Sequence, residues 1–231
     1  MRRYLVVDDN LAFAENLAEI LRDAGSEVAV AESGLRALEL ARVTRFDAVV
    51  TDMRMPGMTG ARLLHEIRRV DPSLPAIVVT AYTGESDLVA ARQEGLLAVL
   101  PKPAPIEVLA GLLGAARRDG LVAVIDDDCA LADNLTDALR ERGFSTVTAL
   151  SLAETDRLGG VHPFMALVDL RMPGGPDGAA LRTLLGLFPD LPVVVMSGHR
   201  DAIARCDPPA RFFFKPFETR KVLDLVEKLW H

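Results

Sequence analysis

The sequence predicts an α/β protein built from two consecutive doubly wound domains, each with a five-stranded parallel sheet covered by helices. Three observations lead to this prediction. The 231-residue chain repeats itself at a distance of about 117 residues, apolar runs alternate with amphipathic stretches, and the apolar runs are continuous. Continuous apolar strands indicate burial on both faces, which is typical of parallel sheets between helical layers.

The repeat covers almost the whole chain. "LVVDDNLAFAENLAEILRDAG" at residues 5–25 matches "AVIDDDCALADNLTDALRERG" at residues 123–143, and three further blocks follow in the same order. The last pair, "AVLPKPAP" and "RFFFKPFE", contains Lys102 and Lys215. We therefore predict a duplicated domain, with residues 1–119 as the first copy and residues 120–231 as the second.

Each copy reads as five strand–helix units. In the first copy, the initial strand ends at an acidic pair, residues 11–21 form an amphipathic helix, and residues 48–50 and 77–79 form buried strands. Helical crossovers between parallel strands are right-handed and give a doubly wound sheet. Ligand sites in such sheets lie at the carboxyl ends of the strands.

Polar side chains follow the predicted strands at that edge in both copies. Three carboxylates, one hydroxyl and one ammonium converge in each copy. They are Asp8, Asp9, Asp52, Thr80 and Lys102 in the first, and Asp126, Asp127, Asp169, Ser197 and Lys215 in the second. Only four lysines occur in the chain, and two of them precede prolines at these positions.

Clustered carboxylates repel one another unless a cation lies among them. A hard divalent cation with oxygen ligands, of which Mg²⁺ is the most available, suits such a cluster. A lysine and a hydroxyl beside it can contact a phosphate. Together these groups would stabilise a phosphoryl group during its transfer to a carboxylate.

With these motifs, "DMRMPGMTG" and "DLRMPGG" above all, each half resembles a receiver domain of bacterial two-component response regulators. The spacings agree: 52 − 8 = 44 and 169 − 126 = 43, and then 80 − 52 = 28 and 197 − 169 = 28. The resemblance implies a CheY-like, flavodoxin-like (βα)₅ fold. It also implies phosphoacceptors at Asp52 and Asp169.

The resemblance extends to the other site residues. It implies that the acidic pairs bind Mg²⁺ together with the backbone carbonyls of Arg54 and Arg171. The aspartyl phosphate would be sensed by Thr80 and Lys102 in the first copy and by Ser197 and Lys215 in the second. The Lys-Pro bonds would be cis.

Two stretches depart from the family pattern. The aromatic switch position is Phe212 in the second copy but Val99 in the first, where Tyr82 is not the usual switch. The interval from Ser197 to Lys215 spans 18 residues against 22 from Thr80 to Lys102, and it contains two adjacent prolines. We therefore expect a shortened or irregular fourth helix in the second domain. The residues at 212–214 are expected to belong to the core of the fifth strand.

Simpler interpretations exist for single residues. Asp9 or Asp127 could cap the following helix instead of binding metal. His65, in "LLHEIRRVDP", resembles a kinase phosphoacceptor but is better interpreted as a surface helical histidine. Cys129 is assigned no role, and the two cysteines have no metal-ligand or disulfide pattern.

Composition limits the partners. The net charge of −7 disfavours nucleic-acid and membrane-surface binding, and no apolar run approaches the ~20 residues that span a bilayer. No signal peptide is visible, so we expect a cytoplasmic protein. We expect a phosphoacceptor rather than an enzyme, although self-phosphorylation from small donors and autodephosphorylation are compatible with it.

The sequence as a whole predicts a stand-alone tandem receiver protein without an effector domain. Phosphate would come from a histidine kinase or phosphotransfer protein, and output would be protein–protein interaction, phosphate relay or a phosphate sink. The downstream target and the oligomeric state stay open. In the alternative, only the first domain is active and the second is a degenerate adaptor or dimerisation module.

Two other classes fit less well. A phosphohydrolase that forms an aspartyl phosphate usually needs a second aspartate two residues after the nucleophile, where this chain has Arg54 and Arg171. A nucleotide-binding Rossmann enzyme needs a glycine-rich loop after its first strand, where this chain has aspartates.

Overall fold

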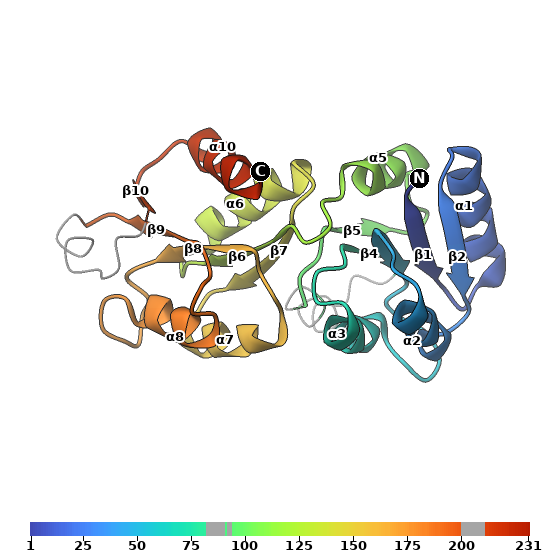
Figure 1. Cartoon of the computed structure of the whole chain (residues 1–231), viewed down its shortest axis with the longest axis horizontal. Helices are drawn as coiled ribbons and strands as arrows, with labels where there is room; N and C mark the ends of the chain where they lie inside the picture. Colours follow the sequence, from blue (N-terminus) through green and yellow to red (C-terminus); the bar gives the residue numbers. More distant parts are fainter. Residues whose placement is uncertain (82–90, 92–93, 200–210) are drawn as a thin grey trace. The chain divides into compact units, whose positions relative to one another are not determined.

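The computed structural model describes residues 1–81, 91, 94–199 and 211–231 of the chain. The chain divides into two compact units, Met1–Asp119 and Gly120–His231. Each unit contains one sheet of five parallel strands with helices on both faces (Figure 1). This confirms the predicted fold class, two tandem doubly wound α/β units.

The first unit has the strand order β2-β1-β3-β4-β5, and every neighbouring pair is parallel. The order reverses direction beside β1, as doubly wound sheets require. The elements are β1 (Arg3–Val7), α1 (Leu11–Asp23), β2 (Glu27–Ala31), α2 (Gly34–Val43), β3 (Ala48–Thr51), α3 (Gly60–Val70), β4 (Ala76–Thr80), β5 (Ala98–Pro101) and α5 (Ile106–Ala115).

The second unit has the equivalent order, β7-β6-β8-β9-β10. Its second helix is short: α7 has five residues and passes directly into a 3₁₀ turn, η1. The elements are β6 (Leu121–Ile125), α6 (Cys129–Glu141), β7 (Ser145–Ala149), α7 (Leu152–Asp156), η1 (Arg157–Gly160), β8 (Met165–Asp169), α8 (Ala179–Leu187), β9 (Val193–Ser197), β10 (Arg211–Phe214) and α10 (Thr219–Trp230).

Strand β3 shows why the apolar runs are continuous. All four of its residues are buried, and successive side chains join different core clusters. Val49 belongs to the cluster that contains Leu63 of α3, whereas Val50 belongs to the cluster that contains Leu17 of α1. Since both faces of the strand are covered, its residues are apolar as far as Val50, and polar residues begin at Thr51, where the strand ends at the site.

The turn after β3 brings α3 close to the end of the strand. Gly60, the first residue of α3, donates its N–H to the Met53 carbonyl at 2.8 Å. A Cβ atom at this position would lie 2.3 Å from the Asp52 carbonyl oxygen, so glycine is required. In the second unit Gly178 donates to the Leu170 carbonyl at 2.7 Å with a φ of 74°.

A buried arginine holds the opposite end of the first unit. Arg68 donates to four backbone carbonyls, those of Pro72 (3.2 Å), Leu74 (2.5 Å), Glu94 (2.6 Å) and Gly95 (2.6 Å). Burial lowers the pKa of Arg68 to about 10, although the charges of Glu94 and Asp71 oppose the shift. The side chain ties the end of α3 to the loops before β4 and β5.

The expectation that residues 212–214 all lie in a strand core is wrong. Phe212 and Phe214 are 49% and 36% exposed and meet edge to face, with ring centroids 5.3 Å apart. Only Phe213 packs against the core, where it meets Phe217. The reason is that β10 is an edge strand of the sheet, and alternate side chains of a strand point to opposite faces.

The predicted irregular fourth helix of the second domain falls within residues 200–210, outside the described residues, as does Tyr82 in the first unit.

Candidate functional site

The carboxyl ends of β1 and β3 bring three aspartates together in the first unit. Asp8 is buried, Asp52 is half-buried and Asp9 is exposed. Each offers a carboxylate oxygen, and these oxygens all lie within 4.8 Å of one another. We call these residues the first acidic cluster. They are the residues that the sequence placed at one edge of the sheet.

The second unit repeats the arrangement at the ends of β6 and β8. Asp126, Asp127 and Asp169 offer oxygens that also lie within 4.8 Å of one another. Asp126 and Asp169 are buried and Asp127 is exposed. This second acidic cluster therefore has the same composition as the first and the same exposed aspartate position, but its Asp169 is buried where Asp52 is half-buried.

A lysine bridges two carboxylates in each cluster. Lys102 Nζ lies 2.6 Å from Asp8 Oδ2 and 2.7 Å from Asp52 Oδ2. Lys215 Nζ lies 2.7 Å from Asp126 Oδ2 and 2.7 Å from Asp169 Oδ2. Each lysine follows a strand adjacent to the one that carries the hydroxyl residue, and both Lys-Pro peptide bonds are cis.

The charges of each cluster do not balance. Three carboxylates and one ammonium give −3 + 1 = −2 when all are ionised. The lysine contacts two of the carboxylates, and the third, Asp9 or Asp127, faces solvent. Oxygen donors with a residual charge of −2 match the requirements of a hard divalent cation such as Mg²⁺.

Helix capping does not explain the exposed aspartates. The N-cap of α1 is Asn10, whose side chain accepts from the Phe13 N–H, and the N-cap of α6 is Asp128, which accepts from Ala130 and Leu131. The capping interpretation of Asp9 and Asp127 is therefore wrong by one residue. Both carboxylates are left without a capping role beside their clusters.

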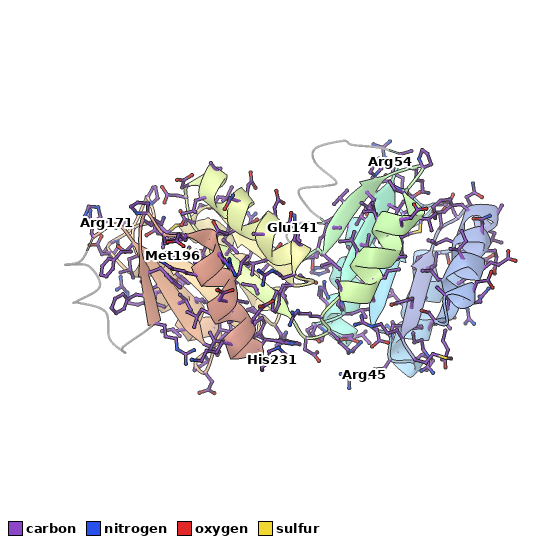
Figure 2. The ribbon with its side chains drawn as sticks, turned by 90° about the horizontal axis from the view of Figure 1, so that it is seen from above. Arg45, Arg54, Glu141, Arg171, Met196 and His231 are labelled. Carbon is purple, nitrogen blue, oxygen red and sulfur yellow. The ribbon has the colours of Figure 1, made fainter. Side chains whose placement is uncertain are left out.

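Backbone amides orient the carboxylates of β3 and β8. The N–H of Met53 donates to Asp52 Oδ1 at 2.6 Å, and the Arg54 N–H lies 3.4 Å from the same oxygen. The Arg171 N–H donates to Asp169 Oδ1 at 3.1 Å. In both units one oxygen thus faces backbone amides and the other faces lysine. Figure 2 labels Arg54 and Arg171.

The hydroxyl residues lie at the ends of β4 and β9. Thr80 and Ser197 are both buried, and their carbonyls accept from the N–H groups of Lys102 (2.9 Å) and Lys215 (3.0 Å). Ser197 Oγ also accepts from the His199 N–H at 3.1 Å. The strand pairing therefore fixes each hydroxyl residue next to its lysine.

Both lysines carry a proton at neutral pH. Burial lowers the pKa of Lys102, but the hydrogen bonds and charges of Asp52 and Asp8 outweigh it and raise the pKa above its ordinary value. Asp126 and Asp169 act in the same way on the pKa of Lys215. Burial raises the pKa of Asp126 despite the nearby lysine. Each site therefore keeps a fixed positive charge beside the carboxylate of β3 or β8.

Comparison with known proteins decides the family. A family model described as the response regulator receiver domain matches residues 4–113. A response regulator receiver protein of Anaeromyxobacter sp. (strain Fw109-5) is 60% identical over 232 residues, covering 99% of this chain and 95% of that protein. The chain belongs to the response regulator receiver family.

Other relatives match one receiver unit. The transcriptional regulatory protein ZraR of Escherichia coli (strain K12) is 39% identical over 112 residues, 48% of this chain and 25% of ZraR. The receiver domain of sensor histidine kinase PA1611 from Pseudomonas aeruginosa PAO1, with a magnesium ion in its active site cleft, has a TM-score of 0.45. It is 29% identical and covers 48% of this chain and 93% of that domain.

The receiver protein takes part in two-component signalling. Receiver domains are phosphoacceptors rather than classical enzymes. In the part of the chain that the structure describes, no helix combines the length and apolar character needed to cross a bilayer.

The remaining sequence candidates contribute no side-chain contact to the carboxylates of the two clusters. His65 is an exposed residue of α3 and lies 3.0 Å from Glu94 Oε1, as a surface histidine should. Cys129 is exposed at the start of α6, with its sulfur 3.9 Å from the Asp127 carbonyl oxygen. Phe212, the predicted switch, points outward on β10.

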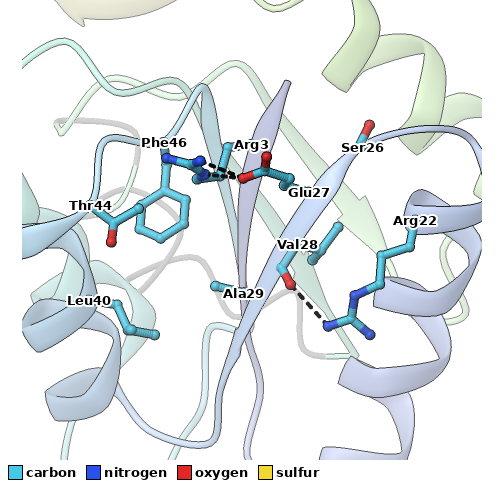
Figure 3. Close-up of a pocket in the computed structure, with 9 residues that line it drawn as sticks. All are labelled: Arg3, Arg22, Ser26, Glu27, Val28, Ala29, Leu40, Thr44 and Phe46. Atoms are coloured by element: carbon cyan, nitrogen blue, oxygen red, sulfur yellow. Dashed lines mark hydrogen bonds and ion pairs between the residues drawn. The ribbon is translucent and has the colours of Figure 1, made fainter. Parts of the chain in front are cut away.

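The receiver protein also has a surface pocket of about 650 Å³ that is separate from the acidic clusters. It lies beside β1 and β2 and is lined by residues that include Arg3, Arg22, Glu27 and Phe46 (Figure 3). Arg3 and Glu27 form an ion pair across it. None of its lining residues belongs to the site described above.

Sequence reasoning missed several residues that shape the receiver sites. Asn10 and Asp128 stand directly before amphipathic helices, a signal that could have identified them as caps. Gly60 could have been recognised as a close-approach glycine only from its place at a strand–helix turn. Phe13, which lies against Lys102, carries no signal in the sequence.

Proposed function

We propose that the protein is a Mg²⁺-dependent phosphoryl acceptor with two working sites, at Asp52 and Asp169. The observation that carries this proposal is the lysine bridge found in both units, between a buried aspartate and the aspartate of β3 or β8. In each unit the bridging ammonium already touches an oxygen of the proposed acceptor. An incoming phosphoryl oxygen would therefore meet a fixed cation.

The proposed reaction transfers a phosphoryl group and needs no redox partner. A carboxylate oxygen of Asp52 or Asp169 forms a bond to phosphorus, the donor's bond to phosphorus breaks, and the leaving group keeps that bonding electron pair. Thr80 or Ser197 would donate a hydrogen bond to the product, and Lys102 or Lys215 would contact one of its oxygens.

Mg²⁺ would be held by each acidic cluster with the carbonyl of Arg54 or Arg171, and it would supply positive charge against the phosphoryl oxygens. The residual charge of −2 in each cluster supports this assignment. Asp9 and Asp127 are the exposed ligands in this scheme, and neither is used as a helix cap.

The phosphoryl donor would be a histidine kinase or a histidine phosphotransfer protein, as for receiver domains generally. Output would follow through protein–protein contact or through onward transfer of the phosphate. The matching geometry of the two clusters favours two acceptors over an arrangement in which the second unit is only an adaptor. Two phosphoacceptors in one chain would serve as a phosphate relay or as a phosphate sink.

The test is the intact mass of the full chain after incubation with acetyl phosphate and Mg²⁺. The wild type, Asp52→Ala, Asp169→Ala and a control, Asp23→Ala, are compared. Asp23 is an exposed aspartate at the end of α1. We expect two phosphate adducts in the wild type and control, one in each site variant, and none when Mg²⁺ is removed.

Other outcomes have defined meanings. Loss of every adduct in Asp52→Ala, with a normal adduct in Asp169→Ala, would make the second unit an adaptor. If neither acetyl phosphate nor a panel of phosphorylated histidine phosphotransfer domains labels the wild type, the phosphoacceptor proposal is refuted.

A further inference from the structure

A phenylalanine ring forms part of the surroundings of Lys102. Phe13 is the third residue of α1, and its ring centroid lies 4.8 Å from Lys102 Nζ. The ring is half-buried and packs against the core cluster of its face of the sheet. It is therefore held in place by packing and presents its π face to the ammonium.

The contact is electrostatically favourable. The face of an aromatic ring carries negative charge density, and a cation within about 6 Å of the centroid is attracted to it. Lys102 Nζ is thus surrounded by Asp8 at 2.6 Å, Asp52 at 2.7 Å and the ring of Phe13. The two carboxylates attract the ammonium, and the ring contributes a third attraction that stays when Asp52 is modified.

The second unit lacks this ring. The repeat aligns Phe13 with Leu131, since 13 + 118 = 131. Leu131 packs against its own core cluster but has no π system. Lys215 makes the same two carboxylate contacts as Lys102, at 2.7 Å each. The two sites therefore differ in the aromatic contact while their ion pairs match.

We propose that Phe13 is a positioning residue for phosphoryl acceptance at Asp52, acting through Lys102. This inference rests on the function proposed above. When a phosphoryl group bonds to an Asp52 oxygen, the carboxylate loses much of its pull on the ammonium. The ring keeps Nζ beside the acceptor, so the cation need not be repositioned as charge develops on the phosphoryl oxygens.

The experiment measures the rate of adduct formation at Asp52 in the Asp169→Ala chain, with acetyl phosphate below saturation and Mg²⁺ in excess. Phe13 is replaced by leucine, which reproduces the second unit. It is also replaced by phenylalanine carrying one, two or three ring fluorines. Fluorine withdraws electron density from the ring face and changes its size little, so packing and cation attraction are separated.

We expect Phe13→Leu to slow the reaction about two- to fivefold, the range that corresponds to a cation–π contact. Successive fluorines should lower the rate stepwise toward that of the leucine variant. The control is Phe46, a buried ring of the other core cluster, whose fluorination should leave the rate unchanged. Thermal unfolding of each variant is measured in parallel.

The outcomes separate the two proposals. If the Asp169→Ala chain forms the adduct at the same rate with phenylalanine, fluorinated phenylalanine and leucine at position 13, the positioning role of Phe13 is overturned and the phosphoacceptor function stands. A slow leucine variant with no trend across the fluorinated rings would assign the effect to packing and would also overturn the inference. If the Asp169→Ala chain takes no phosphate from any donor, both proposals fail together.

Discussion

The close approach of Gly60 to the end of β3 makes Gly60→Ala a sharp test of the site's construction. The added Cβ would lie 2.3 Å from the Asp52 carbonyl oxygen, and ordinary contacts begin at 3.4 Å. The backbone must therefore open by about 3.4 − 2.3 = 1.1 Å. The obstructing atom belongs to the backbone, so no side-chain rotation can relieve the overlap.

The energetic cost follows from that displacement. Overpacking of this kind costs ~1–3 kcal/mol. The Gly60 to Met53 hydrogen bond, now 2.8 Å, would also stretch and lose ~1 kcal/mol. The alanine returns ~0.5–1 kcal/mol through its helix preference. We expect a net loss of about 1–3.5 kcal/mol, which corresponds to a fall in melting temperature of roughly 4–14 °C for a unit of this size.

Calorimetry of the full chain measures this change, and Gly111→Ala is the matched control. Gly111 lies inside α5, and a Cβ there would meet nothing within 4 Å. That variant should gain ~0.5–1 kcal/mol. We also expect acceptance at Asp52 to slow by roughly tenfold or more in Gly60→Ala, because the acceptor is displaced. A Gly60→Ala chain as stable and as reactive as the control would refute the reasoning.

Three further predictions concern the caps, the buried arginine and pH. Asp9→Asn should abolish the increase in the free energy of unfolding that Mg²⁺ gives at the first cluster, and should lower that free energy by less than ~0.5 kcal/mol without metal. Asn10→Ala should lower it by ~1 kcal/mol without metal, because α1 loses its cap. Urea titration with and without Mg²⁺ measures both, and equal metal-free losses would contradict the assignment. Arg68→Met should lower the free energy of unfolding by about 3–5 kcal/mol, because four carbonyls lose their donor. The control is the exposed Arg69→Met, which should lower it by ~0.5 kcal/mol or less in the same urea titration. The raised pKa of Lys102 means that the folded chain holds this proton more tightly than the unfolded chain. Its stabilisation is full below the ordinary value of 10.5 and is lost as pH rises through the folded-state value. The free energy of unfolding should therefore fall more steeply above pH 10.5 in the wild type than in Lys102→Met, and parallel curves would contradict this.

The convergence of Asp8, Asp52 and Lys102 could be predicted because it depends on a rule of topology. Parallel strands end at one edge, so polar residues that follow buried strands must meet there. The sequence also showed the duplication, since the same residue types return in the same order.

Features that depend on a neighbour far along the chain were not predictable. Arg68 reads as a basic residue of an amphipathic helix, and only the packed loops supply its four carbonyls. Phe212 reads as a strand core residue because an apolar run does not reveal that its strand lies at the sheet edge.

The outer border of the first sheet has a consequence for how the protein behaves at high concentration. Glu27 and Ala31 direct their backbone groups toward β1, so Val28 and Val30 direct theirs outward from β2. Arg22 donates to the Val28 carbonyl at 2.9 Å (Figure 3). The guanidinium occupies an acceptor that a strand from another molecule would use and places a charge in its path. Arg22 thereby protects the chain against edge-to-edge aggregation.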